Sequence, residues 1–122
     1  MKHLVFVDDE DFFLNLWKSF AEQLTIPHQV YAFHSIRDFF LFCSENRNLV
    51  EKFNVVVVDR FSHRFDALKG CFASDFRQSF PDFTGQLILC SALESHIEQL
   101  PNGYDLFLSK EDMSLEQLEG WL

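Results

Sequence analysis

The sequence has no apolar run long enough to cross a membrane and few basic residues. The N-terminal apolar run, residues 4–7, is far too short for a signal peptide or a membrane span. Lys and Arg total 10 against 19 Asp and Glu, which gives a formal net charge of −9. Because nucleic-acid backbones and anionic membranes attract cations, we expect this segment to bind neither directly.

Cysteine is scarce and its spacing indicates no metal site. Cys43, Cys71 and Cys90 are odd in number and form no CxxC pair, and the five histidines show no zinc-ligand spacing. These cysteines are therefore predicted to be reduced thiols that pack as small apolar residues. This pattern is typical of a cytoplasmic protein.

Proline and glycine are also infrequent, and no repeat or linker interrupts the chain. A length of 122 residues with 48 % apolar and 24 % charged residues predicts one soluble globular domain over 1–122. Phenylalanine is unusually common, with 16 residues. Most should lie in the core, but so many can leave an apolar surface patch, and together with Trp121 they are compatible with a homodimer.

Short apolar runs alternate with helical patterns along the chain. Strands are predicted at residues 4–7, 29–33, 55–58, 87–90 and 106–108, of which the four valines at 55–58 give the strongest pattern. A helical stripe is predicted at Phe13, Leu16, Trp17, Phe20 and Leu24. Further helices are predicted to start at about 35, 66, 94 and 114. The alternation indicates an α/β fold, a doubly wound five-stranded parallel sheet with about five helices on both faces.

Two of these helices have predicted N-terminal caps. Ser35 precedes Asp38 by three residues, and Ser114 precedes Gln117 by three. A serine at this spacing accepts a hydrogen bond from an otherwise unpaired amide of the first turn. These pairs therefore place the starts of the second and last helices.

Polar residues follow four of the five predicted strands. Asp8 and Asp9 follow the first, Asp59 the third, Ser91 the fourth and Lys110 the fifth. The carboxyl ends of parallel strands share one edge, where ligands of such sheets bind. Three carboxylates there would repel one another without a cation, and an all-oxygen ligand set favours Mg²⁺.

The same residues can carry phosphoryl transfer. A carboxylate such as Asp59 can act as the nucleophile and form an aspartyl phosphate. The Lys110 ammonium and the Ser91 hydroxyl can then neutralise or hydrogen-bond the equatorial phosphoryl oxygens.

Four segments at these strand ends, in their order, resemble bacterial response-regulator receiver domains. They are LVFVDDE at 4–10, VVVVD at 55–59, LILCSA at 87–92 and the segment from Gly103 through FLSK at 107–110. The resemblance covers essentially the whole chain. It implies a flavodoxin-like fold with strand order 2-1-3-4-5.

The resemblance also implies the chemistry of a two-component system. Asp59 would accept a phosphoryl group from a sensor histidine kinase or a phosphotransfer protein, with Mg²⁺ as cofactor. Asp9 would bind the metal directly, Asp8 mainly through water, and the Phe61 carbonyl would be a further ligand beside Asp59. The domain would phosphorylate and dephosphorylate itself rather than turn over as an enzyme.

Signalling would start from the residues that hold the phosphoryl group. The resemblance implies that Lys110 and Ser91 bind its oxygens, and that Phe107 changes rotamer as Ser91 moves. The altered surface would then bind a downstream protein partner.

The chain departs from the family pattern in three places. His63 and Ala67 stand where a proline and a glycine are usual, Glu111 replaces the proline after the lysine, and the fourth helix is about one turn shorter. Glu111 implies either a costly cis bond, at about 3 kcal/mol, or a trans loop that shifts the lysine. The bulk of Phe61 and Leu93 on either side of the site predicts slow loss of the phosphoryl group.

Structural roles compete with these functional ones. Asp8 and Asp9 can cap a helix, Asp59 can be a turn residue, Ser91 begins a capping box with Glu94, and Lys110 and Phe107 can be ordinary surface and core residues. His63 is by default a surface histidine.

Two other functions stay open. One is a degenerate receiver that binds proteins independently of phosphorylation. The other is a phosphatase with an aspartyl nucleophile, which is disfavoured because Phe61 occupies the position of the second acid.

Overall fold

The protein is a five-stranded parallel sheet between two layers of helices. The computed structural model describes residues 1–59, 72–91 and 103–122. Its strands are β1 (Lys2–Val7), β2 (His28–Phe33), β3 (Phe53–Asp59), β4 (Gln86–Ser91) and β5 (Leu106–Ser109). All neighbours pair in parallel, in the order β2-β1-β3-β4-β5. The predicted fold class and strand order are confirmed.

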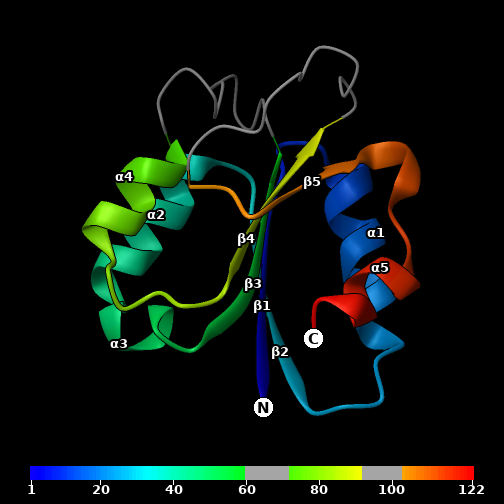
Figure 1. The fold of residues 1–122 in the computed structure, drawn as a ribbon. Coiled ribbons are helices and arrows are strands. Elements are labelled where there is room, and N and C mark those ends of the chain that lie inside the picture. Colours follow the sequence, from blue (N-terminus) through cyan, green and yellow to red (C-terminus); the bar gives the residue numbers. More distant parts are fainter. Residues whose placement is uncertain (60–71, 92–102) are drawn as a thin grey trace.

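Helices cover both faces of this sheet (Figure 1). On one side lie α1 (Asp11–Glu22) and α5 (Leu115–Gly120), and on the other lie α2 (Ile36–Glu45), α3 (Arg47–Val50) and α4 (Phe72–Ser79). The predicted helix at 94–100, and the first residues of the one predicted from 66, lie outside the described residues.

Both predicted caps are confirmed. The Ser35 Oγ accepts a hydrogen bond from the Asp38 amide at 3.0 Å, and the Ser114 Oγ accepts one from the Gln117 amide at 3.1 Å. Two short elements were not predicted, α3 and a 3₁₀ turn, η3 (Lys110–Asp112). Ser109 caps η3 by accepting from the Glu111 amide at 3.2 Å.

The core consists of two clusters separated by the sheet. Successive strand residues point to opposite faces of the sheet, so alternate residues of each strand belong to different clusters. The α2–α4 side buries Val5, Val7, Val56, Val58, Leu87 and Leu89. The α1–α5 side buries Leu4, Phe6, Val55, Val57, Ile88 and Cys90. Burial on both faces explains why the strand sequences are continuously apolar.

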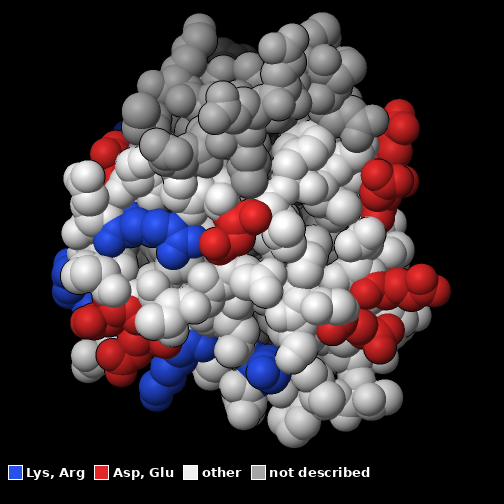
Figure 2. All heavy atoms as spheres, in the orientation of Figure 1, with Lys and Arg blue, Asp and Glu red and all other residues white. Residues whose placement is uncertain are grey.

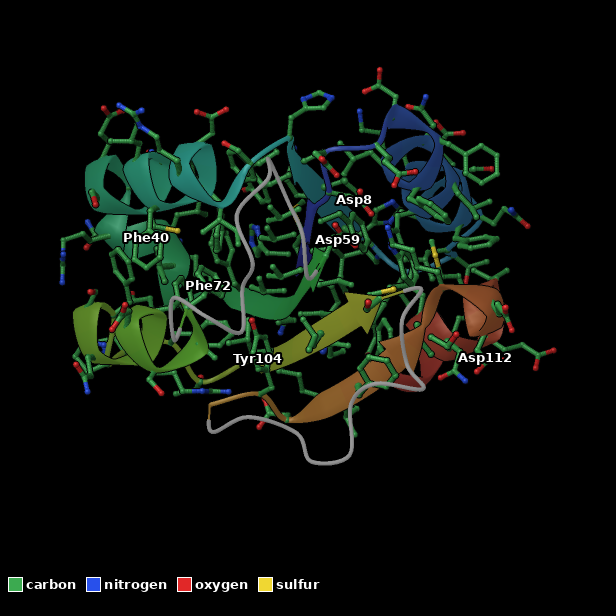
Figure 3. All side chains as sticks on the ribbon, turned by 90° about the horizontal axis from the view of Figure 1, so that it is seen from above. Asp8, Phe40, Asp59, Phe72, Tyr104 and Asp112 are labelled. Atoms are coloured by element: carbon green, nitrogen blue, oxygen red, sulfur yellow. The ribbon has the colours of Figure 1, made fainter. Side chains whose placement is uncertain are left out.

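Most of the described phenylalanines form an aromatic layer on the α2–α4 side. Phe40 and Phe72 lie together there (Figure 3), edge to face with ring centroids 5.4 Å apart. Phe12 is the most exposed described phenylalanine, at 69 %. The predicted thiols Cys43 and Cys90 are free and buried, whereas Cys71 lies outside the described residues.

The stripe predicted for α1 is only partly right. Trp17 is buried and stacks on Phe6 at 5.2 Å, but its buried companions are Leu14 and Ala21. Phe13, by contrast, is only half-buried. The helix is therefore rotated about its axis relative to the predicted stripe, which turns Phe13 toward the rim of the sheet.

The surface in Figure 2 has an uneven charge distribution. Basic side chains lie mainly over the α2–α4 side and the lower edge of this view, where acidic side chains lie among them, whereas the charged side chains on the α1–α5 side are acidic. No helix in the described ranges is long and apolar enough to span a membrane.

Candidate functional site

Two of the predicted site residues, Asp8 and Asp59, meet at the carboxyl edge of the sheet. Val7 of β1 is in register with Val58 of β3. The residues that follow them, Asp8 and Asp59, therefore lie side by side at the same edge of the sheet. Figure 3 shows these two side chains as neighbours above the strand ends. Both are buried, with 3 % and 6 % exposure.

Lys110 joins the two carboxylates. Its Nζ lies 3.0 Å from Asp8 Oδ2 and 2.8 Å from Asp59 Oδ1. The three side chains are only 5–8 % exposed. The peptide bond from Lys110 to Glu111 is trans, as are all bonds of the described residues. With this trans junction the ammonium contacts Asp59 directly, and because its side chain is buried, Lys110 is not a solvated surface lysine.

Asp8, Asp9 and Asp59 form a cluster that could hold a metal ion. One carboxylate oxygen from each lies within 4.8 Å of those of the others, and only Asp9 is exposed. Three carboxylates face one ammonium, so the cluster keeps an excess of negative charge. This excess and the all-oxygen donor set suit a hard divalent cation such as Mg²⁺.

Burial, together with the neighbouring negative charge, raises the pKa of Asp8. Burial and then the nearby Asp59 charge raise this pKa from 3.8 to about 6, although the Glu10 amide and Lys110 both favour the ionised form. For Lys110, burial lowers the pKa, but the pairs with Asp59 and Asp8 outweigh burial and raise it overall. The ammonium is therefore kept charged, while Asp8 is ionised only at a cost.

Asp8 also shapes the turn into α1. Its Oδ1 accepts a hydrogen bond from the Glu10 amide at 2.9 Å. The N-cap of α1 is Glu10 itself, which makes no side-chain capping bond. The capping alternative for Asp8 thus accounts for one oxygen, and its other oxygen pairs with Lys110.

Ser91 and Phe107 lie on the two strands beyond Asp59. Asp59 is in register with Cys90, so Ser91 lies one residue farther toward the carboxyl edge, 1 % exposed. Phe107 is half-buried and packs against the hydrophobic core cluster of the α2–α4 side. Ser91 is thus next to the acidic cluster, whereas Phe107 packs into the core below it.

The predicted Phe61 carbonyl ligand lies outside the described residues, and so do His63, Ala67, Leu93 and Glu94. The loop departures, the slow loss of the phosphoryl group and the capping box at Ser91 therefore stay predictions.

Sequence reasoning missed one residue of the site, Phe13. Its ring centroid lies 3.9 Å from the Lys110 Nζ. Helical spacing assigned Phe13 to the core stripe, and no pattern in the sequence connects it with residue 110.

A scan against protein-family models and a comparison with curated proteins each return no match. Solved structures do match. A CheY-like response-regulator receiver domain from Methylobacillus flagellatus is similar with a TM-score of 0.78 and 16 % identity over 98 % of this chain and 94 % of that one.

Two further similar structures contain a metal ion. A Burkholderia pseudomallei response regulator with a phosphorylated aspartic acid, calcium ion and citrate has a TM-score of 0.74 and 17 % identity over 100 % of this chain and 66 % of that one. The Mn²⁺-bound response regulator Rcp1 has a TM-score of 0.73 and 15 % identity over 99 % and 89 %. The chain therefore has the fold of response-regulator receiver domains.

Proposed function

We propose that this chain is a phosphoacceptor receiver domain of a two-component system, in which Asp59 accepts a phosphoryl group in a Mg²⁺-dependent reaction. The observation that carries the proposal is the buried contact of Asp8, Asp59 and Lys110, with Asp9 beside them, at the carboxyl edge of the sheet. The phosphorylated aspartate and the metal ions named for the structural neighbours support it.

Asp8, Asp9 and Asp59 would hold the metal ion, together with the expected Phe61 carbonyl. The all-oxygen donor set, with three carboxylates beside a single ammonium, supports a divalent cation there. When bound, Mg²⁺ supplies positive charge that offsets the charge of the phosphoryl oxygens.

The Asp59 carboxylate would attack the phosphorus of the donor. A new bond forms between an Asp59 oxygen and phosphorus, and the bond from phosphorus to the donor's leaving atom breaks with its electron pair. Because the attacking group is already a carboxylate, the step requires no general base. A phosphohistidine of a kinase or phosphotransfer protein, or a small acyl phosphate, is a donor of the required kind.

Lys110 and Ser91 would bind the transferred group. The ammonium now pairs with Asp59 at 2.8 Å, so after transfer it lies within reach of the phosphoryl oxygens. The Ser91 hydroxyl, at the end of the adjacent strand, would donate a hydrogen bond to another. Movement of Ser91 toward the phosphoryl group, followed by the neighbouring Phe107 on β5, would alter the surface that a downstream protein binds.

Intact-mass measurement with acetyl phosphate tests this function. We expect addition of one phosphoryl group in the presence of Mg²⁺ and none after chelation. Asp59→Asn should abolish the addition, whereas the exposed Asp82→Asn serves as the matched control and should not. Absence of any Mg²⁺-dependent addition would contradict the proposal and support the degenerate receiver, an interaction module that does not use phosphate.

A further inference from the structure

The Lys110 ammonium is enclosed on three sides by groups from different parts of the chain. Two sides are the carboxylates of Asp8 and Asp59. The third is the ring of Phe13, whose centroid lies 3.9 Å from Nζ. Since the Lys110 side chain is only 6 % exposed, water contributes little to its solvation.

The backbone of α1 holds this ring in place. Phe13 lies in the first turn, where its amide donates to the Glu10 carbonyl at 3.2 Å. The ring of Phe12 packs edge-on against it, with centroids 5.1 Å apart. Asp8, two residues before Glu10, accepts from the Glu10 amide. The turn that carries one carboxylate partner of Lys110 therefore leads directly into the helical turn that carries the ring.

The face of an aromatic ring is the negative end of its quadrupole and attracts a cation. Such a contact is strongest where the cation has lost its water, as here. A lysine ammonium has three N–H donors. Two carboxylates alone leave one direction open, and the ring occupies the space that a water molecule or a rotated ammonium would otherwise take.

We propose that Phe13 is a positioning residue for Lys110 in phosphoryl transfer, an inference that rests on the proposed function. During transfer, Lys110 must exchange contacts with the carboxylates for contacts with phosphoryl oxygens. The ring carries no charge and takes no part in that exchange. It therefore keeps the ammonium over the reacting edge while its charged partners change.

The rate of phosphorylation by acetyl phosphate tests this role. Phe13→Leu keeps an apolar side chain but removes the ring, and should lower the rate constant at saturating donor by about ten- to thirty-fold, the range expected when a desolvated cation–π contact is lost. The KM for acetyl phosphate and the affinity for Mg²⁺ should stay within about two-fold, because Phe13 binds neither.

Two variants separate positioning from simple packing. Phe13→Tyr keeps the ring and should restore the rate to within about two-fold of wild type. Phe20→Leu removes another half-buried ring of α1, one that packs on Trp17, and should leave the rate unchanged. A wild-type rate in Phe13→Leu, or a rate in Phe13→Tyr as low as in Phe13→Leu, would overturn the inference.

The NMR shifts of the Lys110 side chain give a readout that needs no phosphorylation. Protons over a ring face are displaced upfield, so the Lys110 Hε signals should lie upfield in the wild type and in Phe13→Tyr, and return toward ordinary lysine shifts in Phe13→Leu. Ordinary lysine shifts for Lys110 in the wild type would overturn the role of Phe13 but leave the proposed function standing. A chain that shows the upfield signals but accepts no phosphoryl group would instead overturn the proposed function, and the positioning role of Phe13 in phosphoryl transfer with it.

Discussion

Replacing Asp8 with asparagine is expected to stabilise the folded chain when no divalent cation is present. The folded structure raises the pKa of Asp8 from 3.8 to about 6, first through burial and second through the charge of Asp59. One pKa unit corresponds to 1.36 kcal/mol, so ionising this carboxyl at pH 7.5 costs the folded state about 3 kcal/mol. This cost already includes the attraction to Lys110. Asparagine keeps the shape and the acceptor for the Glu10 amide, but its NH2 group meets the Lys110 ammonium where Asp8 Oδ2 accepted, a loss of about 1 kcal/mol. We therefore expect a net gain of about 2 kcal/mol.

The gain should depend on pH in a defined direction. The folded pKa of Asp8 lies above the unfolded one, so the folded state binds more protons between about pH 4 and pH 6. Wild-type stability from this group is thus lost as pH rises through that window. The advantage of Asp8→Asn should be full at pH 7.5 and shrink toward zero near pH 4.

Urea denaturation at several pH values, in a chelating buffer, measures this difference. Asp82→Asn, at an exposed position, is the control and should change stability by less than about 0.5 kcal/mol. Added Mg²⁺ should reverse the order, because a ligand at 100 times its Kd stabilises the wild type by about 2.7 kcal/mol while the variant has lost one carboxylate ligand. An Asp8→Asn variant less stable than wild type at pH 7.5 without metal would refute the reasoning.

The remaining predictions concern other contacts of the fold, and urea denaturation measures each. Lys110→Met leaves two buried carboxylates without their cation and should cost about 3–5 kcal/mol at neutral pH, an effect that Mg²⁺ reduces. Arg77→Ala removes the hydrogen bond to the Gly103 carbonyl at 2.6 Å and the half-exposed ion pair with Asp105, and should cost about 1–2 kcal/mol; an unchanged midpoint would contradict this. Gly85→Ala places a Cβ 2.3 Å from a β3 carbonyl oxygen and should cost more than about 3 kcal/mol, whereas Gly120→Ala meets no atom within 4 Å and should gain about 0.5 kcal/mol. Equal effects of the two glycine replacements would show that the close approach does not matter.

Much of the fold could be predicted because local patterns agree with the tertiary structure. Four consecutive valines at 55–58 are compatible only with a strand buried on both faces, and β3 contains them. Ser35 and Ser114 each lie three residues before the amide they cap, an interaction that depends on local geometry alone. The convergence of Asp8 and Asp59 follows from the parallel sheet, since residues after neighbouring strands share an edge.

The features of the site that could not be predicted depend on how helix α1 is rotated about its axis and on a short turn after β5. The face of α1 that is buried depends on how the helix packs, so its stripe contains Leu14 in place of Phe13. The position of the Lys110 ammonium depends on the 3₁₀ turn after β5, which no periodic pattern indicates. The contact between Phe13 and Lys110 requires both the observed rotation of α1 and the 3₁₀ turn after β5. It also joins residues from opposite ends of the chain.

The most direct test of the account is to locate the phosphoryl group itself. After incubation with acetyl phosphate and Mg²⁺, borohydride converts an aspartyl phosphate to homoserine, which peptide mass spectrometry assigns to a single residue. We expect homoserine at Asp59, dependent on Mg²⁺, and ordinary aspartate at Asp8 and Asp9. Modification at another residue, or aspartate at position 59 under all conditions, would contradict the central claim that Asp59 is the phosphoryl acceptor.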